Sequence, residues 1–169
     1  FLGGILQMLL RQPPTLFDRE HRCRVAWGGG APAHVAQDFE ARFAIEVREN
    51  YGMTEASSLT SFNLDGHKGS VGRPVPYFEV RVVDETDTEL EQRQTGEIIV
   101  KAREPGLITP GYFRNEAATR AAIRDGWLYT GDLGFLDEKG YLFYSGRLKD
   151  NIRRRGENIS AWEIERVVE

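Results

Sequence analysis

The side chains best suited to chemistry lie in residues 126–160, GWLYTGDLGFLDEKGYLFYSGRLKDNIRRRGENIS. Asp132 follows a glycine, where a tight turn would present its carboxylate outward and let it accept both hydroxyls of a ribose. Arg147 follows Gly146 and could bond a sugar or a phosphate. The alternative at Asp132 is an Asx-turn or a cap, and the residues alone leave both readings open. The span as a whole favours a phosphate-bearing ligand.

A run of cations follows Arg147. Its members are Lys149, Arg153, Arg154 and Arg155. Such a run is usually a solvated face and less often a nucleic-acid patch, which would show steeply salt-dependent binding. The net charge of −4 argues against a nucleic-acid partner, because the whole molecule lacks the positive field that non-specific binding needs.

A second group of candidates is YGMTE at residues 51–55. A tyrosine can stack on a base, a threonine hydroxyl can bond a phosphate oxygen, and a glutamate can hold Mg²⁺. The alternative is a turn followed by a helix with Thr54 as its N-cap. Taken alone, this motif favours the alternative.

A third group is GGGAP at residues 28–32. Three glycines allow the backbone to approach a flat ligand closely. An ordinary turn between a strand and a helix is an equally good interpretation of this motif alone.

The elements that must position these residues begin with a parallel α/β unit. Apolar spacing predicts a short buried helix in residues 1–10, a strand at 22–27, a helix at 34–43 and a strand at 45–47. Because ligands of parallel sheets bind beyond the carboxyl ends of the strands, both YGMTE and GGGAP are well placed.

A small β-rich subdomain is predicted next. Residues 66–76 are rich in glycine and proline and indicate a boundary. Beyond them we expect an antiparallel hairpin of strands at 78–82 and 98–100, a helix at 116–123 capped by Asn115, and strands at 127–136 and 141–144. The acidic residues of the hairpin loop, Glu85, Asp87, Glu89 and Glu91, are expected to be solvated.

The overall prediction is an α/β fold in three parts. They are the end of an α/β parallel-sheet subdomain (1–69), a β-rich, distorted-barrel subdomain (70–146), and a hinge with the start of an α+β lid domain (147–169). Ser160 begins a capping box, SAWE, which predicts that a helix starts there.

Composition bounds the protein class. The 169 residues, 40% of them hydrophobic, can bury one domain or one domain plus part of another. A single cysteine, Cys23, excludes an internal disulfide and favours a reducing compartment, so we expect a cytoplasmic protein. The apolar opening is too short for a transmembrane segment and lacks the flanks of a signal peptide.

Together, six motifs resemble the adenylate-forming superfamily of acyl-CoA synthetases, adenylation domains and luciferases. In chain order they are GGGAP, YGMTE, GEIIVKA (96–102), PGYF (110–113), GWLYTGD (126–132) and GRLKDNIRRRGENISAWEIE (146–165). Their order and spacing fit, and the resemblance covers nearly all of the chain from residue 22. The last two look most like carboxylate-CoA ligases, including the crotonobetaine/carnitine-CoA and fatty-acyl-CoA groups.

The resemblance implies a role for each candidate. Tyr51 would stack on adenine with Gly52 and Met53 beside it, Thr54 would contact the α-phosphate, and Glu55 would hold Mg²⁺. The residues expected against adenine and the acyl pocket are Gly28, Gly29, Gly30, Ala31 and Pro32. Asp132 and Arg147 are expected to grip the ribose, and Lys149 is expected at the hinge. The thiol channel would be bordered by Arg153, Arg155 and Gly156.

The implied reaction uses ATP, Mg²⁺ and coenzyme A. A small carboxylic acid attacks the α-phosphate of ATP, and the CoA thiol then displaces AMP from the acyl-adenylate. Two alternatives remain: an adenylation domain that loads an aryl or amino acid onto a carrier protein, and a nucleotide-binding module without catalysis. The family's phosphate loop and C-terminal lysine do not occur in this sequence, so we expect these 169 residues alone to be inactive.

Overall fold

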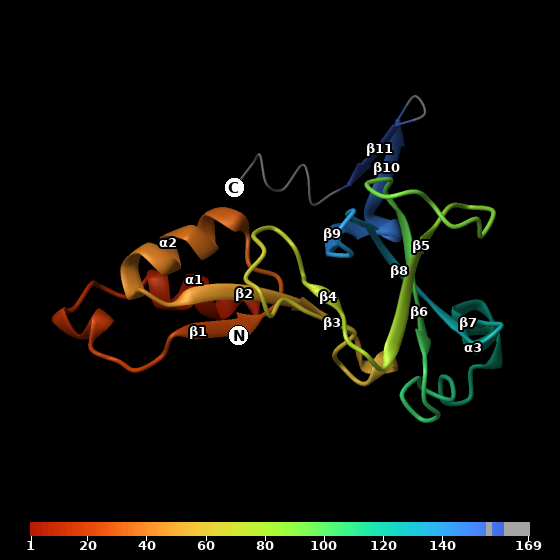
Figure 1. Ribbon diagram of the computed structural model, residues 1–169, viewed down its shortest axis with the longest axis horizontal. Helices are drawn as coiled ribbons and strands as arrows, with labels where there is room; N and C mark the ends of the chain where they lie inside the picture. Colours follow the sequence, from red (N-terminus) through yellow and green to blue (C-terminus); the bar gives the residue numbers. More distant parts are fainter. Residues whose placement is uncertain (155–156, 161–169) are drawn as a thin grey trace.

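The computed structural model describes residues 1–154 and 157–160 of the chain, with side chains up to residue 150. Figure 1 shows a helix-bearing half with α1, α2 and β1–β4, beside a β-rich half with β5–β9. The hairpin of β10 (Asn151–Arg154) and β11 (Glu157–Ser160) extends from the β-rich half. The fold is therefore mixed α/β, as predicted.

The helix-bearing half is built on a parallel β-α-β unit. Strand β1 (Val25–Gly28) pairs in parallel with β2 (Glu46–Tyr51), and α2 (Ala33–Phe43) connects them. The apolar stripe of α2 buries Val35 and Phe39 against Val47 of β2 and Leu6 of α1 (Gly3–Leu10). The predicted order of strand, helix and strand is confirmed.

Two short strands extend this sheet toward the β-rich half. Strand β3 (Ser61–Phe62) pairs antiparallel with the last two residues of β2, and β4 (Arg73–Pro74) pairs with β3. The sheet is therefore mixed, because β3 runs antiparallel to the parallel β1–β2 pair. A short 3-10 turn, η2 (Thr54–Ala56), lies between β2 and β3.

The β-rich half is one antiparallel sheet, curled as in a half-barrel, of order β5-β6-β8-β7, with β9 also paired to β8. The strands are β5 (Phe78–Val83), β6 (Gly96–Ala102), β7 (Ile123–Arg124), β8 (Trp127–Leu136) and β9 (Leu142–Arg147). The predicted hairpin is confirmed as β5 and β6, and Asn115 does cap α3 (Glu116–Ala122), its side chain accepting from the N–H of Ala118 at 3.0 Å.

The two halves share a hydrophobic core. Tyr51, Ala56 and Val71 lie in the same buried cluster as Ile98 and Leu142. The predicted boundary segment contributes directly, since the N–H of Val71 donates to the carbonyl of Leu142 at 2.9 Å. A site built from both halves is therefore held by packing as well as by the chain.

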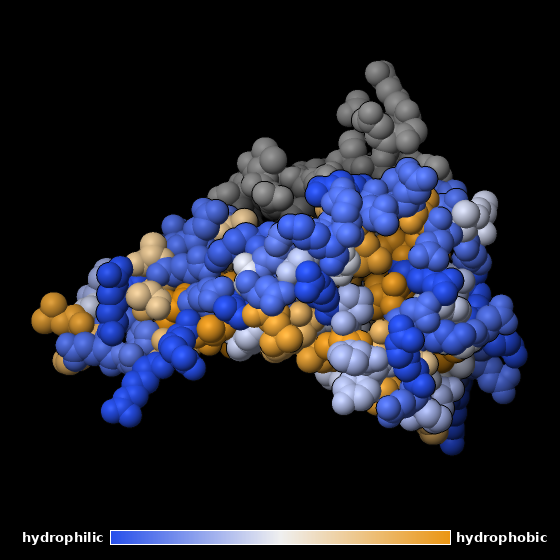
Figure 2. Space-filling model, in the orientation of Figure 1, coloured by the Kyte–Doolittle hydropathy of each residue, from blue (hydrophilic) through white to orange (hydrophobic). Residues whose placement is uncertain are grey.

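Several element predictions need correction. The helix near the N-terminus is largely exposed instead of buried: only its residue Leu6 is buried, and Leu2, Ile5, Met8 and Leu9 are exposed, because α1 packs through one stripe against α2. Figure 2 shows apolar surface at this end of the molecule, near the 3-10 turn η1 (Leu16–Arg19).

Strand limits also differ from the prediction. β1 begins three residues later than predicted, whereas β2 and β9 continue further, each into a predicted ligand motif. The helix predicted after Ser160 lies outside the described residues. Within the described part of the chain, no helix combines the length and apolarity that crossing a bilayer requires.

Candidate nucleotide-binding site

A bulge in β8 sets the position of the central carboxylate. Residues 130–132 are accommodated where the register between β6 and β8 shifts, directly after Glu97. Gly131 adopts φ +69°, and its N–H donates to the Glu97 carboxylate at 2.9 Å. The hydroxyl of Thr130 accepts from the N–H of Asp132 at 3.0 Å. The bulge re-aims the Asp132 side chain away from the regular alternation of the strand.

Asp132 is buried, with 5% of its surface exposed. The prediction that a tight turn presents its carboxylate outward is therefore wrong, because the TGD motif bulges within a paired strand and turns the side chain inward. The Tyr51 hydroxyl donates to Oδ2 of Asp132 at 2.8 Å. The Asx-turn and cap alternatives also fail, since Oδ2 binds a residue 81 positions away and Oδ1 accepts no hydrogen bond from the described backbone.

The second oxygen of Asp132 lacks a hydrogen-bond donor. Arg147 is the register partner of Asp132 across β8 and β9, and its Nε lies 3.2 Å from Oδ1 as an ion pair. The guanidinium donates no hydrogen bond to this atom, and Oδ1 is buried without a hydrogen-bond partner among the described residues. An unsatisfied buried acceptor costs free energy that a ligand's hydroxyl group would recover.

Electrostatics at this cluster follow from burial. Burial raises the pKa of Asp132, while the Tyr51 hydrogen bond and the charge of Arg147 oppose the shift. Burial and the adjacent Asp132 both raise the pKa of Tyr51, and burial is also the main cause of the raised pKa of Tyr144. The Asp132 charge raises the pKa of Arg147. Both phenols therefore remain neutral, and Tyr51 can act as a donor.

The YGMTE motif forms the end of β2 and the turn η2. Thr54 is the first residue of η2 and not its cap; the cap position is Met53, which makes no side-chain cap. The Thr54 N-cap prediction is wrong, because backbone bonds from Ala56 and Ser58 to the Met53 carbonyl, at 3.1 and 2.8 Å, close the turn instead. The Thr54 side chain is left exposed, as a phosphate contact requires.

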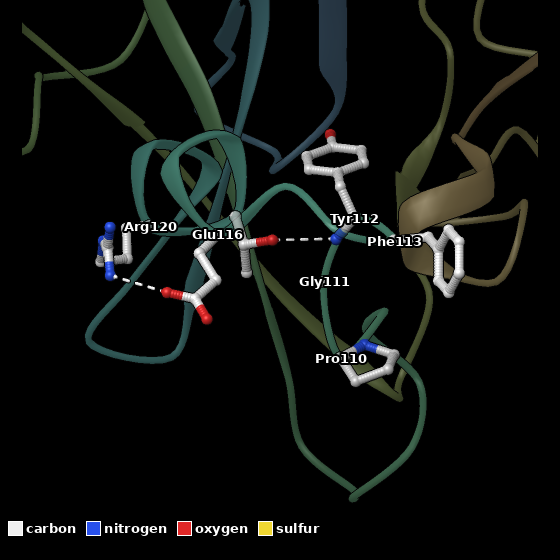
Figure 3. Close-up of a pocket in the computed structure, with 7 residues that line it drawn as sticks. Pro110, Gly111, Tyr112, Phe113, Glu116 and Arg120 are labelled. Carbon is white, nitrogen blue, oxygen red and sulfur yellow. Dashed lines mark hydrogen bonds and ion pairs between the residues drawn. The ribbon is translucent and has the colours of Figure 1, made fainter.

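Glu55 is partly exposed and is oriented by the loop that follows β6. Tyr112 donates its hydroxyl to Oε1 of Glu55 at 3.1 Å. Figure 3 shows the Tyr112 ring pointing away from a surface pocket beside α3, which is lined by Pro110, Gly111, Tyr112, Phe113, Glu116, Thr119 and Arg120. That pocket shares no lining residue with the Asp132 cluster.

The GGGAP segment connects β1 to α2. Gly28 ends β1, Gly30 adopts φ +74°, and Pro32 is the N-cap residue of α2. The N–H of Ala31 donates to the Glu49 carboxylate at 3.1 Å, which ties the segment to β2. Gly28 admits no side chain, since a Cβ there would meet the carbonyl oxygen of Phe1. The strand-to-helix turn is confirmed, and a ligand role remains a prediction.

The remaining candidates follow β9. Lys149 is exposed in the 3-10 turn η3 (Leu148–Asp150), and the backbone of Arg153 lies in β10. Arg155 and Gly156 lie outside the described residues. The structure thus brings together Tyr51, Asp132 and Arg147 by direct contact, and places the other candidates on separate neighbouring segments.

Sequence reasoning missed three supporting residues. Tyr112 binds Glu55, Glu49 binds Ala31, and Tyr144 packs beside Tyr51 with ring centroids 6.1 Å apart. Alternation along the predicted strand 141–144 could have placed Tyr144 on one face. No sequence signal could have paired Tyr112 with a residue 57 positions away.

Comparison with known proteins identifies the family. A profile of the family described as AMP-binding enzyme matches residues 2–113. The chain belongs to this family. It is 40% identical over 146 residues to a long-chain-fatty-acid–CoA ligase of Salmonella typhimurium, covering 83% of this chain and 26% of that protein. A crotonobetaine/carnitine–CoA ligase of Escherichia coli is 33% identical over 169 residues, covering 97% of this chain and 33% of that protein.

The fold comparison agrees with the sequence comparison. An O-succinylbenzoate coenzyme A synthetase of Bacillus subtilis, solved in complex with ATP and a magnesium ion, superposes with a TM-score of 0.80 at 32% identity. The match covers 99% of this chain and 35% of that one. The chain spans about a quarter to a third of the length of these relatives. Its membership of the adenylate-forming superfamily and its α/β fold are confirmed.

Proposed function

We propose that the protein is an ATP-dependent carboxylate-CoA ligase that forms an acyl-adenylate and then an acyl-CoA thioester. The single observation that carries the proposal is the unsatisfied Oδ1 of the buried Asp132, placed against Arg147 and fixed from the other side by Tyr51. Two hydroxyl groups of a ribose would satisfy this carboxylate, and the family of the chain binds AMP.

The other candidates would complete the nucleotide site. Thr54 would contact the α-phosphate, and residues 28–32 with Gly52 and Met53 would border adenine. Tyr51 keeps its proposed place beside adenine and gains a second role, because its hydroxyl holds Asp132 in position. Arg147 has 64% of its side chain exposed, so its guanidinium can turn toward a sugar or phosphate oxygen.

Magnesium fits the donors that are present. Mg²⁺ commonly binds one or two carboxylates and completes its shell with phosphate oxygens and water. Glu55 supplies one such carboxylate, and no group of three or more potential ligands occurs among the described residues. We therefore propose a cation that arrives with the nucleotide and is held by Glu55. Bound there, it would offset charge on the phosphates.

The proposed reaction has two steps. A carboxylate oxygen of the acid forms a bond to the α-phosphorus of ATP, and the bond to pyrophosphate breaks. The CoA sulfur then bonds to the acyl carbon, AMP leaves, and the thiol proton passes to solvent. This chain's residues hold the ribose and phosphates in line, so catalysis is mainly positioning and charge neutralisation.

The hinge and the second step are assigned to residues after β9. We propose that Lys149 marks the hinge between the large and small domains and that Arg153, Arg155 and Gly156 border the thiol channel. A fatty acid or another small carboxylic acid is the proposed substrate, since the relatives above are named for such acids. The proposed location is the cytoplasm, where ATP and CoA are available.

Calorimetric titration with a non-hydrolysable acyl-adenylate analogue tests the nucleotide site. We expect saturable binding by the full-length protein and a loss of about 10- to 100-fold in affinity in Asp132→Asn, which removes an acceptor that is charged in the bound state. Asp38→Asn, an exposed carboxylate on α2, is the matched control and should bind normally. Equal affinity of all three proteins would refute the proposed site.

A further inference from the structure

The loop between β6 and α3 is attached at three points to η2 and to its C-cap residue, Ser57. The Ser57 hydroxyl donates to the carbonyl of Leu107 at 2.9 Å, and the N–H of Thr109 donates to the carbonyl of Glu55 at 2.8 Å. The third attachment is the Tyr112 hydroxyl on Oε1 of Glu55. Two of the three bonds are made to Glu55, one to its backbone and one to its carboxylate, so the loop fixes this residue specifically.

Tyr112 is itself held by the first turn of α3. Its N–H donates to Oγ1 of Thr119 at 2.9 Å, a bond drawn as a dashed line in Figure 3. The Thr119 hydroxyl in turn donates to the carbonyl of Asn115 at 2.9 Å. Gly111 adopts φ +144°, and a Cβ at this position would meet Oγ1 of Thr119 at 2.8 Å. The backbone of Tyr112 is therefore placed by a capped helix and a glycine, and its ring extends from that support to Glu55.

This contact has a chemical consequence for the carboxylate. A hydroxyl that donates to Oε1 fixes the rotation of the carboxyl group and leaves Oε2 available as a ligand. Outer partners that orient a metal ligand in this way commonly affect metal affinity by about 10- to 100-fold when they are removed.

We propose that Tyr112 is a positioning residue that orients the Glu55 carboxylate for the divalent cation carried by a bound nucleotide. The inference rests on the proposed function, because it assigns the cation to Glu55. The inference extends the proposed function, because the β6–α3 loop and α3 would determine how tightly that cation binds. These two segments contain no predicted site residue.

The test measures Mg²⁺ binding rather than turnover. The full-length protein is titrated by calorimetry with a non-hydrolysable ATP analogue at a series of free Mg²⁺ concentrations, and again in EDTA. Mg²⁺ should increase nucleotide affinity, and half of this increase is reached at a characteristic free Mg²⁺ concentration. We expect Tyr112→Phe to raise that concentration by about tenfold. Affinity in EDTA should not change, because the nucleotide contacts themselves are intact. Tyr77→Phe, an exposed tyrosine directly before β5, is the matched control.

A second variant distinguishes orientation from a general effect on folding. In Glu55→Gln the Mg²⁺ enhancement should be largely lost, and adding Tyr112→Phe to it should have no further effect. If Tyr112→Phe shows the same Mg²⁺ dependence as wild type, the inference is overturned and the proposed function still stands. A parallel loss of affinity in EDTA also overturns it, since that result shows a structural role. Absence of nucleotide binding by the wild type overturns both.

Discussion

The Tyr51 hydroxyl donates a 2.8 Å hydrogen bond to Oδ2 of Asp132, and this bond joins the end of β2 to the bulge of β8. It links the parallel α/β unit to the β-rich half at the candidate site. Both residues are buried, with 7% and 5% of their surfaces exposed. Neither half of the fold alone would present this carboxylate in a fixed orientation.

The first prediction concerns Tyr51→Phe, which removes only this donor. The substitution leaves both oxygens of a buried carboxylate without a hydrogen bond, so the free energy of unfolding should fall by about 1–3 kcal/mol. Chemical denaturation of the full-length protein measures this loss. Tyr77→Phe, an exposed tyrosine, should change it little. Equal stability of the two variants would show that the Tyr51 bond carries no free energy.

The second prediction concerns pH. Burial raises the folded-state pKa of Asp132 above the 3.8 of an unperturbed carboxyl. The folded protein therefore binds the Asp132 proton more tightly than the unfolded chain does. Raising the pH from the unfolded pKa through the folded pKa removes this proton and destabilises wild type relative to Asp132→Asn. The melting temperature of the variant minus that of wild type should increase with pH and then level off. Thermal melts from about pH 3 to about pH 8 measure the difference; a flat or falling difference would contradict the assignment.

The third prediction concerns Gly52, which follows the last residue of β2. A Cβ here would meet the carbonyl oxygen of Ser58 and lie 2.8 Å from Cα of Leu59, so Gly52→Ala must displace the turn that carries Thr54 and Glu55. We expect lower stability and weaker nucleotide binding. Gly4→Ala is the control, because nothing lies within 4 Å of its Cβ position in α1, and alanine should stabilise that helix by about 0.5–1 kcal/mol. Normal nucleotide affinity in Gly52→Ala would show that the turn tolerates displacement.

The fourth prediction concerns Arg147→Gln. This side chain is largely exposed, so stability should change little, whereas nucleotide affinity should fall by about tenfold because a charged contact to sugar or phosphate is lost. Arg120→Gln removes an exposed arginine that pairs with Glu116 on α3 and should leave affinity unchanged. Isothermal titration of both variants with the adenylate analogue provides the comparison. A loss of equal size in both would indicate a general charge effect.

Local patterns predicted most of the elements. The strand predicted at residues 127–136 is β8 with its observed bounds, and Asn115 was recognised as a cap from its type and place. Local patterns failed where tertiary contacts determine the structure of a segment. The Thr-Gly-Asp sequence has the composition of a turn, but pairing with β6 on one side and β9 on the other absorbs it as a bulge.

The site residues likewise include some features that the sequence predicts and others that only long-range contacts determine. Asp132 and Arg147 were predicted as one site, and the strand register places them directly opposite each other. The burial of Asp132, the Tyr51 bond and the Tyr112 bond depend on contacts between segments 57 to 81 residues apart, which no local period encodes. Composition likewise could not show that α1 buries only Leu6, because an apolar helix has the same sequence whether one face or all of it is covered.

The central claim is tested most directly by measuring AMP formation and loss of free CoA thiol together in the full-length protein. With ATP, Mg²⁺, CoA and a panel of small carboxylic acids, we predict that at least one acid supports AMP and thioester formation in equal amounts. Asp132→Asn should lose most of this activity and Asp38→Asn should retain it. Failure of every acid to support AMP formation, by a protein that binds the adenylate analogue, would contradict the ligase assignment and favour a nucleotide-binding module without catalysis.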